Sequence, residues 1–592
     1  MSGNNISGFS FQGSDLRDLV FGSDAGDSID GGGGNDILFG RGGDDDIAGG
    51  AGHDLLFGGR GDDGISGGES RDVLFGGRGD DDIQGDAGDD LIFGGRGDDD
   101  IVWNNGDGSD LVFGGRGDDT QIVNASDDAG DNFVLSSFGS LVNIARTNLG
   151  TFDLDLISIE NLVVNTQGGD DRVTLENDVL NRIEIVLDGG ADTADDAPAV
   201  SGADIATGDT IDLSHLTSGV RVDLDENNQG VLQDDVIVDD VNVSDGTAPG
   251  LSEFGNIQID GEIVVDALND FENVIGTDFD DTIFGNAQNN VLQGGDGDDA
   301  LHPFGGEDYV NGGAGTDVLL LNGFANGQFV DMVAGLAGDL NADADGIAEG
   351  ASLNTFRNIE NINGSSVAGD VIFGDDGVNV LNGLGGNDVL DGGAGNDVLI
   401  GGTGDADLLT GGADSDTFVF ANGDGNGSPG SADQIQDFST AEDLFGLNAE
   451  SFGLNADAEL VFANAARIDD GADPAGLDDS LDPATFDAAA NVYVLQGAFA
   501  NAGAARNAIA EARVAAQGDI ATEEDEAGFF IYFNEAQGRN RLFAVEDLDE
   551  VNGSIQQIAN LGGTLAAGDP GRDAALDQLA LFSADNFTFE LA

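Results

Sequence analysis

The chain has 592 residues and a formal net charge of −97, from 115 acidic residues and 18 basic residues, all of which are Arg. This charge excludes nucleic acid and anionic membrane surfaces as expected partners, because both require basic patches. The absence of Cys and the presence of only three His argue against zinc or copper centres.

Acidity of this degree usually predicts disorder, but 40% of the residues are hydrophobic and the acidic residues recur periodically. A fold that depends on a cation accounts for both observations. The length predicts several domains, and no apolar run approaches the ~20 residues of a transmembrane helix. Residues 1–6 have neither a basic nor an apolar segment, so we expect no cleaved signal peptide.

The first part of the chain, residues 1–126, repeats in blocks of nine between Gly13 and Ile122. Gly31–Phe39 reads Gly-Gly-Gly-Gly-Asn-Asp-Ile-Leu-Phe, and Gly49–Phe57 reads Gly-Gly-Ala-Gly-His-Asp-Leu-Leu-Phe. The first six residues of a block favour a turn and the last three a short strand. Two consecutive blocks would close one coil with a strand on each side. A flexible linker has no reason to keep the apolar triplet in register.

The sixth residue of each block is Asp, so stacked coils predict two ladders of carboxylates. One edge would carry Asp27, Asp45, Asp63, Asp81 and Asp99, and the other Asp36, Asp54, Asp72 and Asp90. Asp110, which follows an insertion near Trp103, and Asp119 are also predicted to bind the metal. Carboxylates this close repel one another unless they are protonated or bridged by a cation. Calcium suits the bridge, because it takes six to eight oxygen ligands and Gly-rich turns can direct backbone carbonyls toward it.

These nonapeptides, which follow the pattern G-G-x-G-x-D-x-U-x, resemble the RTX (repeats-in-toxin, hemolysin-type) calcium-binding repeat, and Gly392–Ile400 matches the pattern in full. The resemblance covers roughly half of the chain. It implies a parallel β-roll, multiple bound calcium ions, export by the type I secretion machinery and an extracellular location. It leaves the activity open, because such rolls accompany proteases, lipases, toxins, adhesins and surface-layer proteins.

The predicted roll has two different outer faces, because strand alternation turns the eighth residue of a block inward and the seventh and ninth outward. One face would be a stripe of Leu, Val and Phe, and the other would be acidic. The stripe ends in Phe21, Phe39, Phe57, Phe75, Phe93 and Phe113. An apolar stripe of this length marks an interface. It either docks on another part of the chain or supports self-association or surface attachment through Phe39, Phe57, Phe75 and Phe93.

Residues 127–270 form a second, β-rich and solenoid-like region. Alternating patterns predict strands at Phe152–Ile157, Arg182–Leu187, Gly219–Leu224 and Ile257–Asp260. A short tag recurs as Ile159-Glu160-Asn161, Phe271-Glu272-Asn273 and Ile359-Glu360-Asn361. It lies just before a Gly/Asp block each time, which suggests a coil that leads into a roll, although a chance recurrence of strand ends remains an alternative.

Two further rolls are predicted, at residues 271–322 and 363–445, with a β or loop insertion at 323–362. Their sixth positions are Asp281, Asn290, Asp299, Asp308 and Asp317 in the first, and Asp370, Asn379, Asp388, Asp397 and Asp416 in the second. Asn should weaken its two sites. In the insertion, Asp339, Asp343, Asp345 and Glu349 suggest an EF-hand loop, but the glycine position and the strand context are wrong for one.

Residues 446–592 are predicted to form a small α+β region. Asp433–Phe438 and Asp443–Phe445 resemble the segment that closes the last roll in RTX proteins. Ala498–Gln517 predicts an amphipathic helix, and Gly528–Phe533 with Arg541–Val545 predicts a hairpin. The end, Asp585–Ala592, is similar to the uncleaved C-terminal signal of type I secretion substrates.

The sequence predicts no catalytic and no cofactor-binding residue. His53, His215 and His302 are isolated, with the first and last expected at the surface of repeats and His215 at a strand end. Gly64-Ile-Ser66-Gly-Gly68 matches the serine-hydrolase elbow, but it lies inside a repeat and has no evident His partner. No P-loop or dinucleotide fingerprint appears.

The sequence therefore predicts an all-β protein of parallel β-rolls that folds on calcium after type I secretion. Its expected role is structural, at a cell surface or in a matrix, in the manner of a surface-layer protein or an adhesin. The alternative is a secreted enzyme or toxin with its site in residues 127–270 or 446–592.

Overall fold

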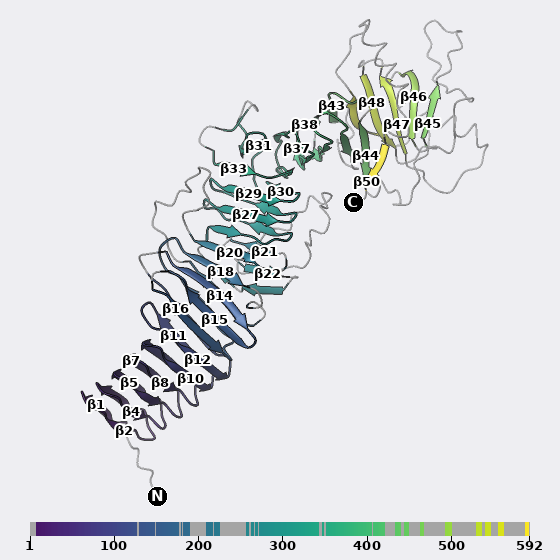
Figure 1. Cartoon of the computed structure of the whole chain (residues 1–592). Coiled ribbons are helices and arrows are strands. Elements are labelled where there is room, and N and C mark those ends of the chain that lie inside the picture. The colour runs from purple at the N-terminus through teal and green to yellow at the C-terminus, as the bar shows by residue number, and fades with distance from the viewer. Residues whose placement is uncertain are drawn as a thin grey trace, which may run out of the picture. The chain divides into compact units, whose positions relative to one another are not determined.

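Figure 1 shows the computed structural model, in which every element of the described residues is a β-strand. The structure describes residues 8–126, 130–148, 150–176, 179, 182–189, 209–216, 218, 220–224, 256–259, 262–265, 267–269, 271–341, 346–348, 351–404, 406–420, 433–439, 443–448, 462–466, 492–499, 528–534, 539–545, 555–561 and 587–590. The chain forms two compact units, one of Met1–Asp235 with Leu251–Asp317 and one of Val236–Gly250 with Val318–Ala592.

The first unit begins with two parallel sheets that face each other. One sheet has the strand order β1 (Ser10–Ser14), β3 (Ser28–Gly32), β5 (Asp46–Ala51), β7 (Gly64–Glu69), β9 (Asp82–Ala87), β11 (Asp100–Asn104), β13 (Thr120–Asn124), β17 (Asn161–Asn165), β19 (Glu184–Asp188) and β24 (Ala267–Asn269). The other sheet contains the strands of the Phe stripe, in the order β2 (Leu19–Phe21), β4 (Ile37–Phe39), β6 (Leu55–Phe57), β8 (Val73–Phe75), β10 (Leu91–Arg96) and β12 (Leu111–Arg116), followed by β16 (Phe152–Ile157).

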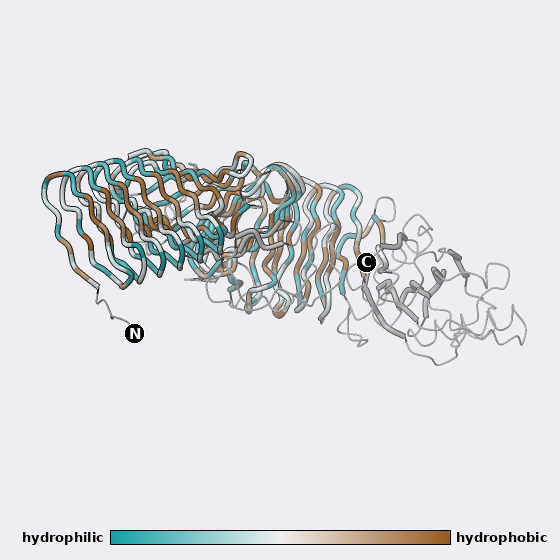
Figure 2. The backbone as a smooth tube through the Cα atoms, turned by 90° about the horizontal axis from the view of Figure 1, so that it is seen from below, coloured by the Kyte–Doolittle hydropathy of each residue, from teal (hydrophilic) through white to brown (hydrophobic). Residues whose placement is uncertain are grey.

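The register of these strands confirms that two blocks close one coil. Leu56 pairs with Leu74, and Ile47 pairs with Ile65, in parallel strands. Leu56 and Leu74 are fully buried, while the residues on either side of them are half-buried and face outward. Bands of hydrophobic and hydrophilic residues therefore recur in each coil (Figure 2). One inward residue per strand gives a narrow core of stacked aliphatic side chains.

The middle region continues the coils, with long insertions between them. A hairpin of β14 (Asn132–Phe138) and β15 (Leu141–Arg146) pairs with β16. The parallel ladder then runs from β14 through β18 (Arg172–Glu176), β20 (Thr210–His215), β25 (Asn273–Ile275), β27 (Val291–Asp296) and β29 (Tyr309–Ala314). A further sheet holds β21 (Arg221–Asp223), β22 (Asn256–Ile259), β23 (Glu262–Val265), β26 (Thr282–Phe284) and β28 (Ala300–His302). The four strands predicted here correspond to β16, β19, β21 and β22.

The second unit repeats the two-sheet arrangement. One sheet holds β30 (Val318–Leu320), β34 (Asn361–Asn363), β36 (Val380–Asn382), β39 (Val398–Ile400), β42 (Thr417–Phe420), β44 (Leu444–Asn448) and β50 (Phe587–Glu590). The other holds β31 (Gln328–Asp331), β35 (Val371–Phe373), β38 (Val389–Ala394), β41 (Leu408–Ala413), β43 (Asp433–Ile435) and β49 (Ile555–Leu561). Shorter pairs are β32 (Leu336–Asp339) with β33 (Leu353–Arg357), and β37 (Gly385–Gly386) with β40 (Thr403–Gly404).

The C-terminal strands include the predicted hairpin, which is β47 (Gly528–Asn534) antiparallel to β48 (Arg539–Val545). β45 (Phe462–Ala466) and β46 (Val492–Phe499) pair in parallel beside it. The helix predicted at 498–517 lies outside the described residues, except that its first two positions end β46. The expected secretion signal is described only at β50. Of the acidic positions that suggested an EF-hand, Asp339 ends β32 and the other three lie outside the described residues.

Candidate metal centre

Each sixth-position Asp of the first roll lies in one of two ladders at the turns between the sheets. Its Oδ1 accepts a hydrogen bond from the backbone N–H of the ladder residue in the preceding coil. On one edge Asp45 donates to Asp63 and Asp63 to Asp81, both at 2.9 Å, and on the other Asp54 donates to Asp72 at 2.6 Å. The carboxylates are buried, because the turns of adjacent coils close over them. The structure thus places all the predicted Asp residues of residues 1–126 in these two rows.

The second carboxylate oxygen of these residues has no hydrogen-bond partner. Buried Oδ2 atoms without a donor occur at Asp36, Asp45, Asp54, Asp63, Asp72, Asp81, Asp90, Asp99, Asp119, Asp299, Asp388 and Asp397. A buried polar atom left unsatisfied is costly, and an ionised carboxylate more so. A native fold rarely repeats such a defect in coil after coil. The row of unsatisfied oxygens therefore indicates a site for a proton or a cation.

The first glycine of each block has no side chain beside this oxygen, so a cation could reach it. A Cβ on Gly58 would lie 2.5 Å from Oδ2 of Asp63 and 2.8 Å from the carbonyl oxygen of Gly76. A Cβ on Gly76 would likewise lie 2.4 Å from Oδ2 of Asp81. The space beside each glycine is thus bounded by a carboxylate oxygen and a carbonyl oxygen, and a side chain would fill it. Oxygen atoms of these two kinds are the ligands that calcium takes.

Burial also raises the pKa of the ladder carboxyls. Desolvation raises the pKa of Asp63 to about 7 and that of Asp90 to about 8, and neighbouring carboxylates add to the effect. In the later rolls, desolvation raises the pKa of Asp299 to about 8 and that of Asp388 to about 9. Without a cation, the ladders can be buried near neutral pH only by taking up protons, and this cost opposes folding. A divalent cation would replace those protons.

The described residues contain no group of three or more His, Asp or Glu side chains gathered around one point. A metal at the ladder would therefore take backbone carbonyl oxygens together with the Asp oxygens. The predicted calcium fits this donor set, since it accepts carbonyl and carboxylate oxygen in flexible geometry. Asp27, Asp36, Asp45, Asp54, Asp63, Asp72, Asp81, Asp90, Asp99, Asp110 and Asp119 would hold it in the first roll.

The same ladders recur at the predicted positions of the later rolls. In the first unit, Asp281 donates to Asp299 and Asp299 to Asp317, each at 2.8 Å. Asp308 accepts from the N–H of Asn290 on the other edge, also at 2.8 Å. In the second unit the ladders carry Asp370 and Asp388 on one edge and Asn379, Asp397 and Asp416 on the other.

Several ladder residues were missed by the sequence analysis. Asp388 donates to Asp407 at 2.8 Å, and Asp407 donates to Asp433 at 3.1 Å. On the other edge, Asp416 donates to Asp443 at 3.1 Å. An extra residue in one block puts Asp407 out of the nine-residue period. Asp433 and Asp443 are out of the period because their spacings are longer and irregular. The segment that resembled a closing coil thus extends both ladders of its roll.

The middle region continues the ladder with widely spaced residues. Asp171 donates to Asp209 at 2.8 Å, and Asp209 donates to Oε2 of Glu272 at 2.9 Å. Asp119 donates to Oε2 of Glu160 at 3.0 Å. Glu160 and Glu272 belong to the recurrent tag, so in these two copies its Glu is a ladder residue. The only sequence signal for this role was the recurrence itself.

The side chains of the two Asn residues in the ladders have hydrogen-bond partners without a cation. Nδ2 of Asn290 donates to the carbonyl oxygen of Glu272, and Nδ2 of Asn379 donates to that of Glu360, each at 2.9 Å. The amide oxygen of each Asn occupies the place of the unsatisfied Asp oxygen and accepts a hydrogen bond from the backbone N–H of Asn286 or Asp375. The amide nitrogen faces the preceding coil and supplies a donor of its own. The expected weakening of these sites stays a prediction, and it now has a structural reason.

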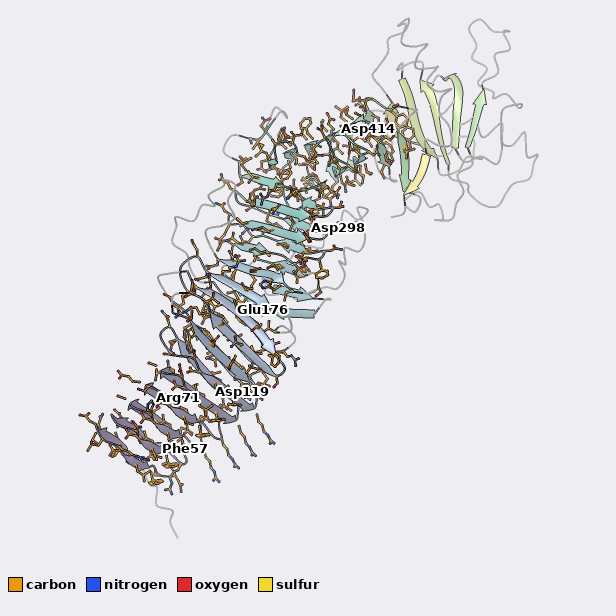
Figure 3. The ribbon with its side chains drawn as sticks, in the orientation of Figure 1. Phe57, Arg71, Asp119, Glu176, Asp298 and Asp414 are labelled. Carbon is orange, nitrogen blue, oxygen red and sulfur yellow. The ribbon has the colours of Figure 1, made fainter. Side chains whose placement is uncertain are left out.

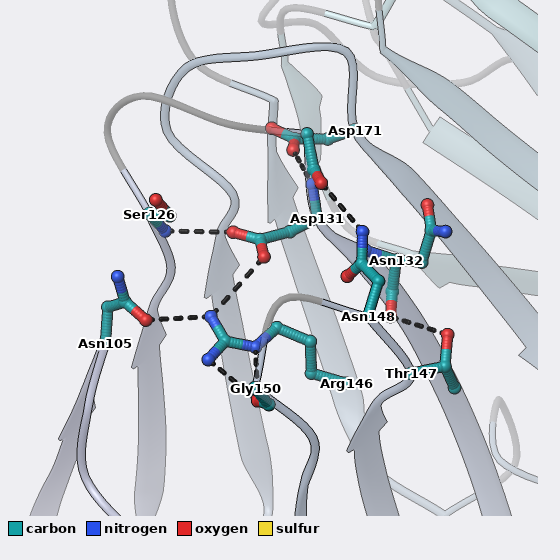
Figure 4. Close-up of polar contacts among 10 residues, drawn as sticks. Asn105, Ser126, Asp131, Asn132, Arg146, Thr147, Asn148, Gly150 and Asp171 are labelled. Atoms are coloured by element: carbon teal, nitrogen blue, oxygen red, sulfur yellow. Dashed lines mark hydrogen bonds and ion pairs between the residues drawn. The ribbon is translucent and has the colours of Figure 1, made fainter.

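Arg146 provides a second kind of cation at the end of the first roll (Figure 4). Its guanidinium is buried beside Asp131, with 3.4 Å between Nη1 and Oδ1. It also donates to Asn105 at 2.8 Å and to the carbonyl oxygen of Gly150 at 2.9 Å. Its carbon Cζ lies 5.2 Å from the ring centroid of Phe152. Here an Arg of the chain itself neutralises a buried ladder carboxylate.

The three His residues have separate surroundings. His53 is exposed and His215 ends β20, both as predicted. The prediction that His302 lies at the surface is wrong, because the side chain is 1% exposed and stacks on Phe304 with 3.8 Å between ring centroids. Phe304 has a φ of 58°, and its backbone N–H donates to Nδ1 of His302.

The coils match the family of the RTX calcium-binding nonapeptide repeat over residues 12–47, 39–74, 66–101, 105–121, 275–303, 304–325 and 373–405. The chain carries RTX calcium-binding repeats. Proteins with RTX repeats are typically secreted by type I systems, which supports an extracellular location. No helix in the described part of the chain has the length and apolarity needed to span a bilayer.

One solved structure similar to this RTX chain is the extracellular lipase LipA from Serratia marcescens. The two sequences are 21% identical over 30% of this chain and 32% of the lipase chain, with a TM-score of 0.13. The match thus spans about a third of the lipase. No curated protein matches the sequence.

Proposed function

We propose that this RTX chain is a type I-secreted extracellular protein that folds on calcium and then self-assembles in a structural, cell-surface or matrix role. The observation that carries the proposal is the row of buried Asp oxygens without a donor. In a medium poor in calcium the ladders repel one another, which keeps the chain open. Millimolar calcium outside the cell then couples binding to folding.

The assembly part of the proposal rests on the apolar face of the first roll. Six Phe rings, from Phe21 to Phe113, stack along it with centroids 4.7–4.9 Å apart. Phe21 is 55% exposed and Leu19 is 61% exposed at the first coil. Among the described residues, the rings of this ladder stack only on one another. A regular apolar face of this kind supports packing against a second copy.

We also propose that the chain has no catalytic role. Ser66 of the motif that matched a serine-hydrolase elbow lies within β7, where its hydroxyl donates to a carboxylate oxygen of Asp86. A nucleophile elbow requires a sharp turn between a strand and a helix. Hydrolytic activity of the calcium-loaded protein, abolished by a point change outside the rolls, would overturn this part of the proposal.

Light scattering during a calcium titration, with circular dichroism in parallel, tests the proposal. We expect β-structure to form first and particle mass to rise afterwards. The double variant Phe57→Ser with Phe75→Ser should fold with calcium but remain monomeric. The matched control, Val102→Ser with Ile122→Ser, changes outward residues of the opposite sheet and should still assemble. Folding without any change in particle mass would contradict the assembly role. A circular dichroism signal that does not change with calcium would contradict calcium-dependent folding.

A further inference from the structure

One edge of the first roll carries a column of Arg side chains. They follow the Phe strands in the turns that lead to the opposite sheet, at Arg60, Arg78, Arg96 and Arg116. Backbone hydrogen bonds place them on consecutive coils, because Gly79 donates to the carbonyl of Arg96 and Gly97 to that of Arg116. Figure 3 shows a row of long side chains that project into solvent from an edge of this roll.

These four guanidinium groups are exposed and have no partner among the described residues. None of the four takes part in an ion pair or a side-chain hydrogen bond within the described part of the chain. The chain has only 18 basic residues against 115 acidic ones. A column of unpaired Arg in so acidic a protein is therefore a feature that the fold itself does not use.

A column of exposed Asp runs along the same edge, two residues further on in each turn. Its members are Asp44, Asp62, Asp80, Asp98 and Asp118. Unlike the buried ladder, this one is linked in the opposite direction, since Asp80 donates to Oδ1 of Asp62 at 3.0 Å and Asp98 to Oδ1 of Asp80 at 2.9 Å. These bonds hold the carboxylates in a regular row at the surface. The sequence analysis did not single out this row.

The two columns share one repeat, because both follow the spacing of parallel strands, which is about 4.8 Å. A second copy of the roll has the same repeat, because it has the same sequence and the same coils. An Arg column of one copy and an Asp column of another can therefore stay in register over every coil. Exposed ion pairs are weak one at a time, so only a matched row of them makes a specific contact.

We propose that two copies of this chain dock along this edge, with the Arg column of each against the Asp column of the other. Arg60 lies toward the Phe sheet, three residues after Phe57, and Asp62 lies toward the acidic sheet, two residues before Gly64. A two-fold axis parallel to the roll axis exchanges these two sides of the edge. Each Arg then faces an Asp, and the contact is self-complementary, as a two-fold interface requires. The edge contact leaves the Phe faces of both copies open.

The edge contact rests on the proposed function, because it needs a calcium-folded roll that self-associates. It adds a second contact to the Phe face, with its own residues. Both contacts together would allow each copy to join two neighbours. The test therefore uses charge variants of the edge, whose effects differ from those of Phe57→Ser with Phe75→Ser.

The experiment is sedimentation velocity on the full chain at saturating calcium, with circular dichroism to confirm folding. The variant R60D/R78D/R96D should lose the dimer contributed by this edge, with at least a tenfold higher dissociation constant. Adding D62R/D80R/D98R restores the net charge of the wild type and inverts both columns. The inverted protein should associate as the wild type does. Arg71→Asp, on the opposite edge of the roll (Figure 3), is the control and should have no effect.

Association that is unchanged in R60D/R78D/R96D would overturn the edge contact and leave assembly through the Phe face standing. Loss of association in the inverted variant, with normal folding, would also overturn it. If the inverted variant fails to fold, R60Q/R78Q/R96Q decides, because these side chains hold no bond within the described structure. A last arm adds soluble poly-glutamate as a probe. Arg-dependent binding of this probe by a protein that stays monomeric would assign the column to a polyanion instead.

Discussion

The backbone N–H of Asp63 donates to Oδ1 of Asp81 at 2.9 Å, while Oδ2 of Asp81 is buried without a donor. One carboxylate thus does two things at once. Oδ1 fixes the register between coils by accepting a hydrogen bond, and Oδ2 can take a proton or bind a cation. The dependence of the fold on calcium and its dependence on pH should therefore come from the same atoms.

The metal-free protein should gain β-structure as the pH falls. Desolvation raises the pKa of Asp63 and Asp81 to about 7 and that of Asp90 to about 8, against an ordinary value of 3.8. The folded state therefore binds more protons than the unfolded state between about pH 4 and 8, and its stability falls as the pH rises through this window. Circular dichroism in chelator should show more β-structure at pH 5 than at pH 8. An opposite trend would contradict protonation of the ladder. With calcium present, acidification should instead raise the calcium concentration needed for folding.

Gly58→Ala should weaken calcium binding at one step of the ladder. The new Cβ would lie 2.5 Å from Oδ2 of Asp63, so the carboxylate and the adjacent backbone must shift. We expect a cost of about 1–3 kcal/mol in the calcium-loaded protein, as for other overpacked sites. Gly64→Ala is the matched control, because its Cβ meets only an Asp46 oxygen at 3.3 Å. Chemical denaturation at fixed calcium compares the stability of the two variants. Equal losses of stability would argue against a metal site beside Gly58.

Asn290→Asp should create an additional calcium site. The amide nitrogen that donates to the carbonyl oxygen of Glu272 at 2.9 Å would become a second carboxylate oxygen without a donor. The variant should be less stable than the wild type in chelator and should bind more calcium at saturation. Equilibrium dialysis counts the ions. Asn289→Asp is the control, since its side-chain oxygen accepts from Glu307 at 2.8 Å in either form. An unchanged calcium count in Asn290→Asp would contradict the role given to the amide.

Arg146→Gln should destabilise the end of the first roll whether or not calcium is present. The change leaves Asp131 buried beside no positive charge, and breaking a buried pair in this way costs about 3–5 kcal/mol. Thermal unfolding with calcium and with chelator should show a loss in both conditions. Arg182→Gln changes an exposed Arg and should have little effect. If saturating calcium restored the stability of Arg146→Gln in full, a metal rather than the guanidinium would neutralise Asp131.

The sequence alone was sufficient to predict the coil, the inward residue of each strand and the Asp ladders of the regular blocks. Leu56, Asp63 and Phe57 lie where the period of nine places them, because a coil made of two consecutive blocks is a local structure. Position along the chain then sets position in space. The pattern also separated the apolar Phe face from the acidic face before any contact was known.

Only the tertiary structure revealed the ladder through Asp131, Asp171, Asp209 and Glu272, and the guanidinium of Arg146 beside it. These residues are 38 to 63 positions apart along the ladder, so no fixed period connects them. Their hydrogen bonds depend on where each long insertion rejoins the sheet. The self-satisfied Asn290 and the outward Arg and Asp columns likewise required atomic positions, because a sequence names a side chain but not the groups that remain without a partner.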